Sequence, residues 1–396
     1  MEKFENKSAL SLEKKKELLF LTRTLGRAGV GVSLVSVLNN MDYSRYNITL
    51  GVQFPIKDLE TEIPAGVKIV YYGEITSEAY RSIFNWKNSL KGKSGVIKLV
   101  WHLLNRIEEL RMHFKVRLCF RRRYDTATAY HQGMASKYVI HDVRANKKIM
   151  WYHSSVIEYP WYKQLFRKAD LIITDSFKAR DTMIEEWGKK EFENKIVGIH
   201  PQVPIEEIKQ KADEEINYKV EEDQFLIMSC GRLSEEKGMD LAVKAVSILK
   251  EKGFKNIKWI IVGDGPEREK LEKMIVEYEV VDNIQLLGFK SNPYPYFKLC
   301  SLYVQPSRLE AFGLTMAEAQ VLGKPVVTTE TNGGKESVEN MVSGLVTPIS
   351  AEAISEAIES ILVAPDFYQQ LLNNVVSIDF HKQREEAISL INELEG

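Results

Sequence analysis

The sequence predicts an α/β protein built from two doubly wound domains in tandem. Three observations lead to this prediction. Short apolar runs of strand length alternate with helical patterns, the alternation occurs twice, and glycine-rich turns follow several of the runs. A polar stretch at 205–223 separates the two series, and 396 residues suffice for two domains. We therefore expect domains at 1–203 and 204–377, followed by a helical segment at 378–396.

The first series opens with a strand at 18–22, a turn containing Gly26, Gly29 and Gly31, and a helical pattern at 32–40. Further runs of strand length follow it to the end of the first predicted domain. These runs lie at 48–54, 67–72, 126–130, 148–152, 171–174 and 196–199.

The second series has short apolar runs with helical patterns between them, for example at 240–250 and 267–278. Regular alternation of this kind is typical of a parallel sheet with crossover helices. The runs lie at 225–230, 259–262, 284–287, 302–305 and 326–328.

Composition excludes several classes of protein. Lys and Arg number 54 against 55 Asp and Glu, a balance that argues against a nucleic-acid partner. Cys119, Cys230 and Cys300 are widely spaced and lie in apolar contexts, so we expect buried free thiols in a reducing compartment. No run resembles a signal peptide or reaches the length of a membrane span, which leads us to expect a cytoplasmic protein.

The segment 307–318 carries the most chemical information. It lies between an apolar run and a helical pattern, with Glu310 in the loop and Glu318 in the helix. Gly313 and Thr315 would stand at the helix start, where backbone N–H groups favour an anion. Two carboxylates beside an anion site suit a ligand with hydroxyls and phosphates, such as a nucleotide sugar. On spacing alone, two solvated helix carboxylates would be the better interpretation.

Two more turns follow strands of the second series. Arg232 and Lys237 come directly after the strand at 225–230, where doubly wound sheets bind ligands, and their charges suit a diphosphate. Taken alone, this could be a solvated charged loop. Gly263 and Gly265, followed by a proline, form the next turn, which lacks the third glycine of a dinucleotide fingerprint.

Together these segments resemble the signatures of the family-four, retaining GT-B glycosyltransferases, in particular bacterial capsular and surface-polysaccharide enzymes. The resemblance rests on four segments. They are Glu310 and Glu318 with seven residues between them and Ala-Phe-Gly after the first, Gly-Arg-Leu…Lys-Gly at 231–238, Gly-x-Gly-Pro at 263–266, and Leu-Gly-Phe-Lys at 287–290. It implies a GT-B fold: two Rossmann-like domains facing across a cleft, with the final helix crossing back to the first.

The resemblance also implies roles for individual residues. Glu318 would bind the ribose hydroxyls and Glu310 a hydroxyl of the donor sugar, while Arg232 and Lys237 would hold the diphosphate. The remaining donor-binding residues would contribute mostly backbone groups near the base and the diphosphate. They are Gly29, Gly31, Gly263, Gly265, Phe289, Phe312, Gly313, Leu314 and Thr315.

Three further positions allow two interpretations. His153, in Trp-Tyr-His, is similar to a family histidine that touches the donor sugar, although a lone histidine is often structural. With Glu310, Arg232 and Lys237 it completes the expected catalytic set. The turn with Gly29 and Gly31 departs from the family's Gly-Gly pair and could be a tight turn without a ligand. Glu336 resembles a family loop residue bordering the sugar, but a capped helix start explains it equally well.

The implied reaction moves a sugar, with retention, from a nucleoside-diphosphate sugar (UDP-sugar in the first instance) to a glycan or lipid-linked saccharide in surface-polysaccharide synthesis. No cofactor is expected, and no metal, because the cations would stabilise the leaving charge and no Asp-x-Asp motif ends a strand. Two alternatives remain open. One is a catalytically degenerate GT-B subunit that supports a partner. The other is a nicotinamide-dependent oxidoreductase, which would leave the Arg, Lys and Glu set unexplained.

A basic, aromatic stretch at 87–123 stands apart from these motifs. It holds 11 Lys and Arg against two Glu, with apolar residues interleaved at helical spacing. A basic amphipathic helix containing Trp is typical of an element that lies on an anionic membrane surface. The alternative is a domain helix with an apolar core face and a solvated basic face. The first interpretation predicts a peripheral contact with the inner face of the cell membrane.

Overall fold

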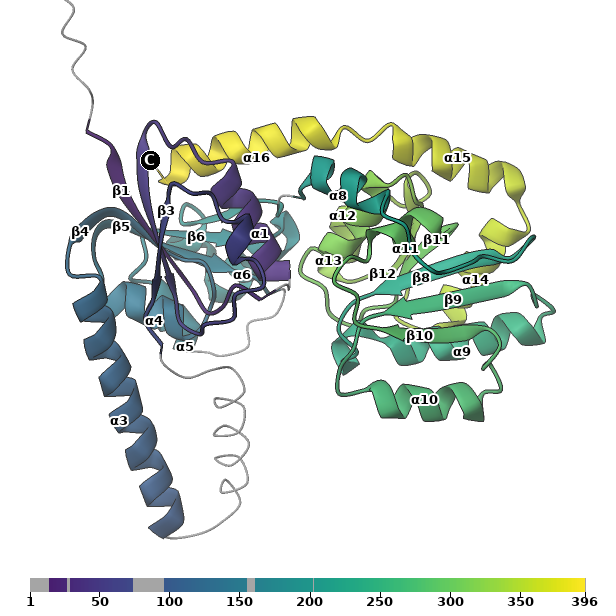
Figure 1. The fold of residues 1–396 in the computed structure, drawn as a ribbon, viewed down its shortest axis with the longest axis horizontal. Helices are drawn as coiled ribbons and strands as arrows, with labels where there is room; N and C mark the ends of the chain where they lie inside the picture. Colours follow the sequence, from purple (N-terminus) through teal and green to yellow (C-terminus); the bar gives the residue numbers. More distant parts are fainter. Residues whose placement is uncertain (1–13, 27–28, 74–95, 155–160, 202, 396) are drawn as a thin grey trace, which may run out of the picture. The chain divides into compact units, whose positions relative to one another are not determined.

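The computed structural model describes residues 14–26, 29–73, 96–154, 161–201 and 203–395 (Figure 1). By its internal contacts the chain divides into two compact units. Unit 1 comprises Met1–Trp151, Lys163–Ile172 and Ile388–Gly396, and unit 2 comprises Tyr152–Tyr162 and Ile173–Ala387.

Within the described residues, the first sheet has seven strands in the order β3-β2-β1-β4-β5-β6-β7. The pairs β3–β2, β2–β1, β1–β4 and β4–β5 are parallel. Leu18 to Leu21 of the central strand are fully buried, as expected for a strand covered on both faces. The strands are β1 (Lys16–Thr22), β2 (Tyr46–Val52), β3 (Val67–Tyr71), β4 (Arg123–Ala129), β5 (Arg144–Tyr152), β6 (Leu171–Thr174) and β7 (Ile196–Gly198).

The helices that connect these strands begin and end at recognisable residues. For example, the Ser176 hydroxyl accepts a hydrogen bond from the Ala179 N–H and caps one helix, which Gly188 ends. The helical elements are α1 (Gly29–Asn39), η1 (Glu60–Glu62), α3 (Val96–Cys119), α4 (Met134–His141), α5 (Trp161–Phe166), α6 (Phe177–Trp187) and α7 (Lys189–Phe192).

The second sheet, of six strands, has the order β10-β9-β8-β11-β12-β13, and its neighbouring strands are parallel. The strand order reverses between β8 and β11, which is where doubly wound sheets bind ligands. The strands are β8 (Phe225–Cys230), β9 (Ile257–Val262), β10 (Ile284–Gly288), β11 (Leu302–Gln305), β12 (Val326–Thr329) and β13 (Gly344–Thr347).

Helices cover both faces of this sheet, because side chains of its strands alternate between two apolar clusters. Trp259 and Ile261 of β9 join one cluster with α9, α10 and α14, while Ile260 and Val262 join the other with α8, α11 and α12. The helical elements are α8 (Ile205–Ala212), η2 (Glu235–Lys237), α9 (Met239–Glu251), α10 (Arg268–Glu277), α11 (Tyr294–Leu299), α12 (Leu314–Val321), α13 (Asn332–Ser337), α14 (Ala351–Leu362), α15 (Pro365–Val376) and α16 (Phe380–Glu395).

The predicted α/β class is confirmed by these two parallel sheets. All predicted strands occur, while β13 was not predicted. The boundary expected near residue 204 falls between the last strand of the first sheet and the first strand of the second, and the domain limits stay a prediction. Near the chain end, the Tyr46 hydroxyl donates to the Asn392 carbonyl at 3.0 Å, and both residues belong to unit 1.

The structure also bears on the predictions for the cysteines and for membrane-spanning segments. Cys300 is buried and Cys230 nearly so, but Cys119 is exposed, so the prediction of three buried thiols was wrong. Cys119 is the last residue of α3, on the same side as the buried Met112 and Val116, and its position at the helix end leaves it exposed. No helix among the described residues is long and apolar enough to cross a membrane. Of the basic stretch 87–123, residues 87–95 lie outside the described residues.

Candidate functional site

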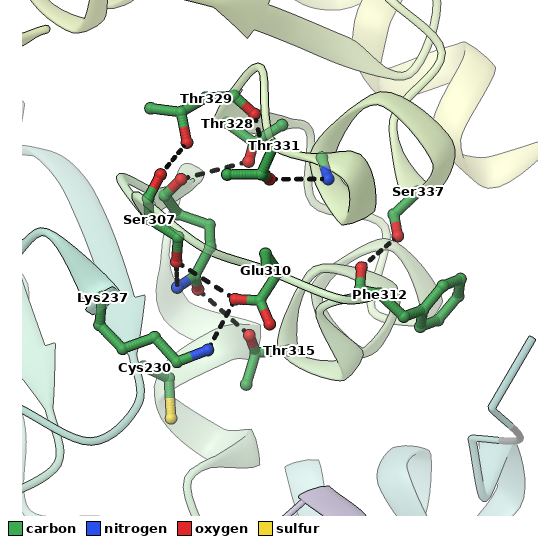
Figure 2. Close-up of polar contacts among 12 residues, drawn as sticks. Cys230, Lys237, Ser307, Glu310, Phe312, Thr315, Thr328, Thr329, Thr331 and Ser337 are labelled. Atoms are coloured by element: carbon green, nitrogen blue, oxygen red, sulfur yellow. Dashed lines mark hydrogen bonds and ion pairs between the residues drawn. The ribbon is translucent and has the colours of Figure 1, made fainter. Parts of the chain in front are cut away.

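Lys237 and Glu310 meet where the second sheet reverses its strand order. Lys237 ends η2, after β8, and Glu310 lies in the loop after β11. The Lys237 Nζ atom is 2.6 Å from a Glu310 carboxylate oxygen, and the same oxygen accepts a hydrogen bond from the Ser307 hydroxyl at 3.2 Å. Figure 2 shows these three side chains turned toward one another. A cation and a carboxylate are thus held together beside the point where the sheet would receive a ligand.

The two loops that carry this pair are fastened to each other. The Arg308 guanidinium makes two hydrogen bonds of 2.7 Å to the Asp240 carboxylate, a bidentate arrangement. The loop containing Gly238 also passes very close to the end of β11, because a Cβ added there would lie 1.9 Å from the Pro306 carbonyl oxygen. Gly238 has a φ of 64°, which favours glycine as well. These contacts fix the positions from which Lys237 and Glu310 reach each other.

A buried amide links Glu310 to the start of α12. Gln305, fully buried at the end of β11, donates to the Ser307 hydroxyl at 2.8 Å and accepts from the Thr315 hydroxyl at 3.2 Å. Its amide oxygen also accepts from the Tyr303 hydroxyl at 2.5 Å. Through Ser307 this network reaches Glu310, so the predicted sugar-binding carboxylate and the predicted phosphate-binding helix start share one hydrogen-bonded support.

The start of α12 presents backbone N–H groups on a fixed turn. Gly313 stands at the N-cap with a φ of 83°, and Leu314 is the first helical residue. The carbonyl of Phe312, a nearly buried residue, accepts a hydrogen bond from the Ser337 hydroxyl at 2.6 Å, which holds the turn against α13 (Figure 2). The helix start predicted near Gly313 is confirmed, and a role of Phe312, Gly313, Leu314 and Thr315 in donor binding stays a prediction. The first N–H groups of a helix are suited to an anion.

Glu318 has a very different environment from Glu310. It lies on α12 with 8% of its surface exposed, and its carboxylate accepts a hydrogen bond from the Tyr294 hydroxyl at 3.3 Å. Burial raises the pKa of Glu318 to about 7, the Tyr294 hydrogen bond opposes this rise, and the charge of Glu207 adds to it. The carboxylate predicted to meet the ribose is thus poorly solvated, and about half of it is ionised at pH 7.

The turns after β8, β9 and β10 lie next to one another. The Leu233 N–H donates to the Asp264 carbonyl at 3.0 Å, and the Gly263 N–H donates to the Gly288 carbonyl at 2.9 Å. These bonds bring Gly263 and Gly265 beside the loop of Arg232, and Phe289, which is largely exposed, follows directly. Arg232 is exposed, and within the described part of the chain its guanidinium forms no hydrogen bond or ion pair.

His153 follows β5 and lies almost fully buried in unit 2. Its Nδ1 atom is 2.8 Å from an Asp175 carboxylate oxygen, and Asp175 follows β6. An Asp partner on one ring nitrogen fixes the orientation of the ring. Gly29 and Gly31 belong to unit 1, where they form the first turn of α1. A role of His153, Gly29 and Gly31 in donor binding stays a prediction.

Glu336 has partners that the sequence did not suggest. Its carboxylate accepts hydrogen bonds from the backbone N–H groups of Phe177 at 2.6 Å and Lys178 at 2.9 Å, and it pairs with the His200 ring at 2.5 Å. Burial would raise the pKa of Glu336, but these hydrogen bonds, led by the one with His200, hold it below its ordinary value. The start of α13, at Asn332, is capped by Thr331, whereas Glu336 lies near the end of this helix. Glu336 therefore joins α13 to the start of α6.

Sequence reasoning missed Gln305, Tyr294 and Asp175, which support the predicted residues. Gln305 could have been noticed, because it is an amide at the end of the otherwise apolar and aromatic run 302–305. Among the described residues, no group of three or more His, Cys, Asp and Glu could hold a metal ion. The expectation of a metal-independent reaction stays a prediction.

Comparisons with known proteins agree with this arrangement. Residues 210–375 match the family model described as glycosyl transferases group 1. The chain is 30% identical over 189 residues, 48% of its length and 49% of the relative's, to the Campylobacter jejuni N-acetylgalactosamine-N,N'-diacetylbacillosaminyl-diphospho-undecaprenol 4-alpha-N-acetylgalactosaminyltransferase. It is 28% identical over 160 residues, 40% of its length and 41% of the relative's, to the Streptomyces kanamyceticus alpha-D-kanosaminyltransferase. The chain thus spans about half or less of the length of these curated relatives.

A solved structure extends the likeness to both sheets. Anabaena Alr3699/HepE in complex with UDP matches with a TM-score of 0.68 at 16% identity, covering 95% of this chain and 100% of that one. A likeness at this identity concerns the fold, and it confirms the predicted GT-B class. The family match covers the turns after β8 to β12 that hold Arg232, Lys237, Glu310 and Glu318. Residues 210–375 are therefore a group 1 glycosyltransferase domain in a chain of GT-B fold.

Proposed function

We propose that the protein is a retaining glycosyltransferase that moves a sugar from a UDP-sugar to a glycan or a lipid-linked saccharide in surface-polysaccharide synthesis. The observation that carries this proposal is the Lys237–Glu310 pair, 2.6 Å apart at the reversal point of the second sheet, with Arg232 exposed on the same loop. Cations for a diphosphate and a carboxylate for a sugar hydroxyl are thereby grouped at one strand end.

In the proposed complex the donor lies along the ends of β8 and β11. Glu318 accepts hydrogen bonds from the ribose hydroxyls, and Glu310 accepts one from a hydroxyl of the donor sugar. Arg232, Lys237 and the N–H groups of 313–315 bind the diphosphate. A lysine ammonium has three N–H donors, so Lys237 can keep Glu310 as a partner while it contacts a phosphate oxygen.

The same groups would act in the transfer step. The bond between the anomeric carbon and the diphosphate oxygen breaks as the bond to the acceptor oxygen forms on the same face of the sugar. The departing phosphate oxygen takes the acceptor's hydroxyl proton. Arg232 and Lys237 stabilise the negative charge that develops on the diphosphate, which is the main electrostatic contribution this site can make. His153, oriented by Asp175 at 2.8 Å, would contact the donor sugar.

Two of the similar proteins support the donor and the acceptor class. Alr3699/HepE has been solved with UDP and with UDP-glucose, the latter matching this chain with a TM-score of 0.67. The Campylobacter relative is named for an acceptor linked to diphospho-undecaprenol. A lipid-linked acceptor would require the protein to work at the cytoplasmic face of a membrane. We include a peripheral membrane contact through 87–123 in the proposal.

The experiment is a thermal-shift panel with UDP, GDP, ADP and their common sugars on the wild type, on Glu318→Ala and on Glu356→Ala. Glu356 is an exposed residue of α14 and serves as the matched control. A ligand at a hundred times its dissociation constant adds about 2.7 kcal/mol of stability, enough for a shift of a few degrees. We expect a shift with UDP and UDP-sugars that Glu318→Ala loses and Glu356→Ala keeps.

Retention is tested separately, by the anomeric coupling constant of the product in proton NMR. A product with inverted configuration would contradict the retaining mechanism but leave donor binding intact. NAD is added to the same thermal-shift panel, and a shift with NAD and none with any nucleoside diphosphate would contradict the proposed function as a whole.

A further inference from the structure

Helix α3 carries a continuous apolar stripe on its exposed side. Its five large side chains are between 44% and 67% exposed. A helix turns about 100° per residue, so their spacing of four, three, four and four places them within an arc of about 80°. The stripe residues are Leu103, Ile107, Leu110, Phe114 and Leu118.

Contacts of α3 with the rest of unit 1 fix the direction in which the stripe faces. Met112 and Val116 are buried and lie across the helix from it. The Arg117 Nε donates to the Asp142 carboxylate at 2.7 Å, and His113 pairs with the same carboxylate. Figure 1 shows α3 continuing well past the sheet of unit 1. The helix therefore cannot roll to bury the stripe without breaking these contacts.

Cations border the stripe, whereas the acidic residues of α3 lie away from it. By the same helical geometry, Arg106 and Arg117 lie along one edge of the stripe and Arg111 along the other, while Glu108 and Glu109 lie farther around the helix. Arg111 and Arg117 are 44% and 61% exposed, although each also contacts a carboxylate of the protein. An apolar stripe with arginines on both sides is complementary to acyl chains below a layer of anionic headgroups.

We propose that the stripe of α3 docks on an anionic lipid bilayer, with the five apolar side chains inserted at the headgroup boundary and the bordering arginines on lipid phosphates. This inference builds on the membrane contact in the proposed function and assigns it to one face of one helix. A second copy of the chain is a poorer occupant. A symmetric pairing of two stripes would bring bordering arginines of both copies together, and like charges repel across such an interface.

The experiment is sedimentation of the full chain with vesicles of phosphatidylcholine, with or without phosphatidylglycerol. The test variant is Leu110→Ser combined with Phe114→Ser, and a charge variant is Arg106→Gln. The matched control is Val276→Ser, which changes a side chain that is 66% exposed on α10 of unit 2. The melting temperature and the thermal shift with UDP are measured for each variant, because these side chains are exposed and should not affect folding or donor binding.

We expect the wild type and Val276→Ser to bind vesicles that contain phosphatidylglycerol. The double variant should bind them at least about tenfold more weakly, because two large apolar side chains no longer enter the bilayer. Arg106→Gln should weaken binding about fivefold, a factor that should shrink as salt is added. Retained UDP shifts with lost vesicle binding would locate the effect in docking alone.

Three results would overturn the inference. The wild type could fail to bind anionic vesicles while it still responds to UDP, which would leave the proposed enzyme intact. The double variant could bind as well as the wild type, which would exclude the stripe. Analytical ultracentrifugation could show that the wild type is a dimer, that the double variant is a monomer and that the dimer does not bind vesicles. This result would assign the stripe to a contact with a second copy of the chain.

Discussion

Replacing Glu318 by Gln should stabilise the ligand-free protein while it weakens donor binding. Glu318 is buried on α12, where its pKa rises from an ordinary 4.5 to about 7. The folded state therefore holds the proton more tightly than the unfolded state, so stability falls as the pH rises from 4.5 to about 7. Above pH 7 the full loss of folding stability from this pKa difference is about 3 kcal/mol. Glutamine has nearly the same shape and no ionisation, so this cost disappears in the variant.

The assay is the free energy of unfolding of the wild type and Glu318→Gln, measured by urea denaturation between pH 5 and pH 8. Glu318→Gln should be more stable by about 1 kcal/mol at pH 5 and by up to about 3 kcal/mol at pH 8. For a unit of this size that corresponds to roughly 6 to 12 °C in melting temperature. Glu356→Gln, at an exposed position, should show no such pH-dependent gain.

The second part of the prediction concerns the affinity for UDP, which should be lower in Glu318→Gln. If the ionised carboxylate receives the ribose hydroxyls, the wild-type affinity for UDP should rise with pH up to about 7 and then level off, while that of Glu318→Gln stays lower and flat. A stability difference independent of pH, or a loss of stability in Glu318→Gln at pH 8, would refute the reasoning from burial. An unchanged UDP affinity in the variant would refute the ribose contact.

Three further substitutions follow from the supporting contacts. Gly238→Ala should cost about 2 kcal/mol or more, because its Cβ would lie 1.9 Å from a carbonyl oxygen, whereas Gly253→Ala, also at positive φ but with nothing within 4 Å, should cost about 1 kcal/mol. Equal losses in urea denaturation would contradict this. Gln305→Leu should cost about 2 to 4 kcal/mol and raise the KM for the donor, since its three side-chain partners lose their amide; an unchanged KM would argue against its supporting role. Glu336→Gln should be less stable than the wild type at pH 7, and the gap should close toward about pH 3, because a lowered pKa adds stability that is present above 4.5 and lost as the pH falls. A gap that stays constant with pH would show that the charge of Glu336 contributes nothing.

The sequence could predict which loops lie together but not how their side chains are supported. In a parallel sheet the carboxyl ends of the strands share one edge, so the loops of Lys237 and Glu310 were expected to be neighbours. The burial of Glu318 was not predictable in the same way. Its helix is apolar around most of its circumference, with Met316, Ala317 and Ala319 buried as well, so its pattern does not single out a solvent face.

Short elements and side-chain direction account for the other differences. The strand β13, Gly344–Thr347, has only two large apolar residues between a glycine and a threonine, so no apolar run marks it. Gln305 ends a four-residue buried strand, where both faces are covered and alternation is weak. Glu336 pairs with residues more than a hundred positions earlier in the chain, and no local pattern reports on such a contact.

The two carboxylates of the segment 307–318 differ in a way that bears on catalysis. Glu310 already has a cation and a hydroxyl as partners in the ligand-free protein. One more hydrogen bond, from a sugar hydroxyl, therefore changes the free energy of its carboxylate little. Glu318 has a phenol at 3.3 Å and little water, so its charged form lacks donors until a ligand provides them. Ribose hydroxyls would supply these donors. Burial of the charged Glu318 destabilises the ligand-free protein, and hydrogen bonds from the donor would remove this destabilisation and so strengthen donor binding. A neutral residue at this position should therefore raise stability and weaken binding.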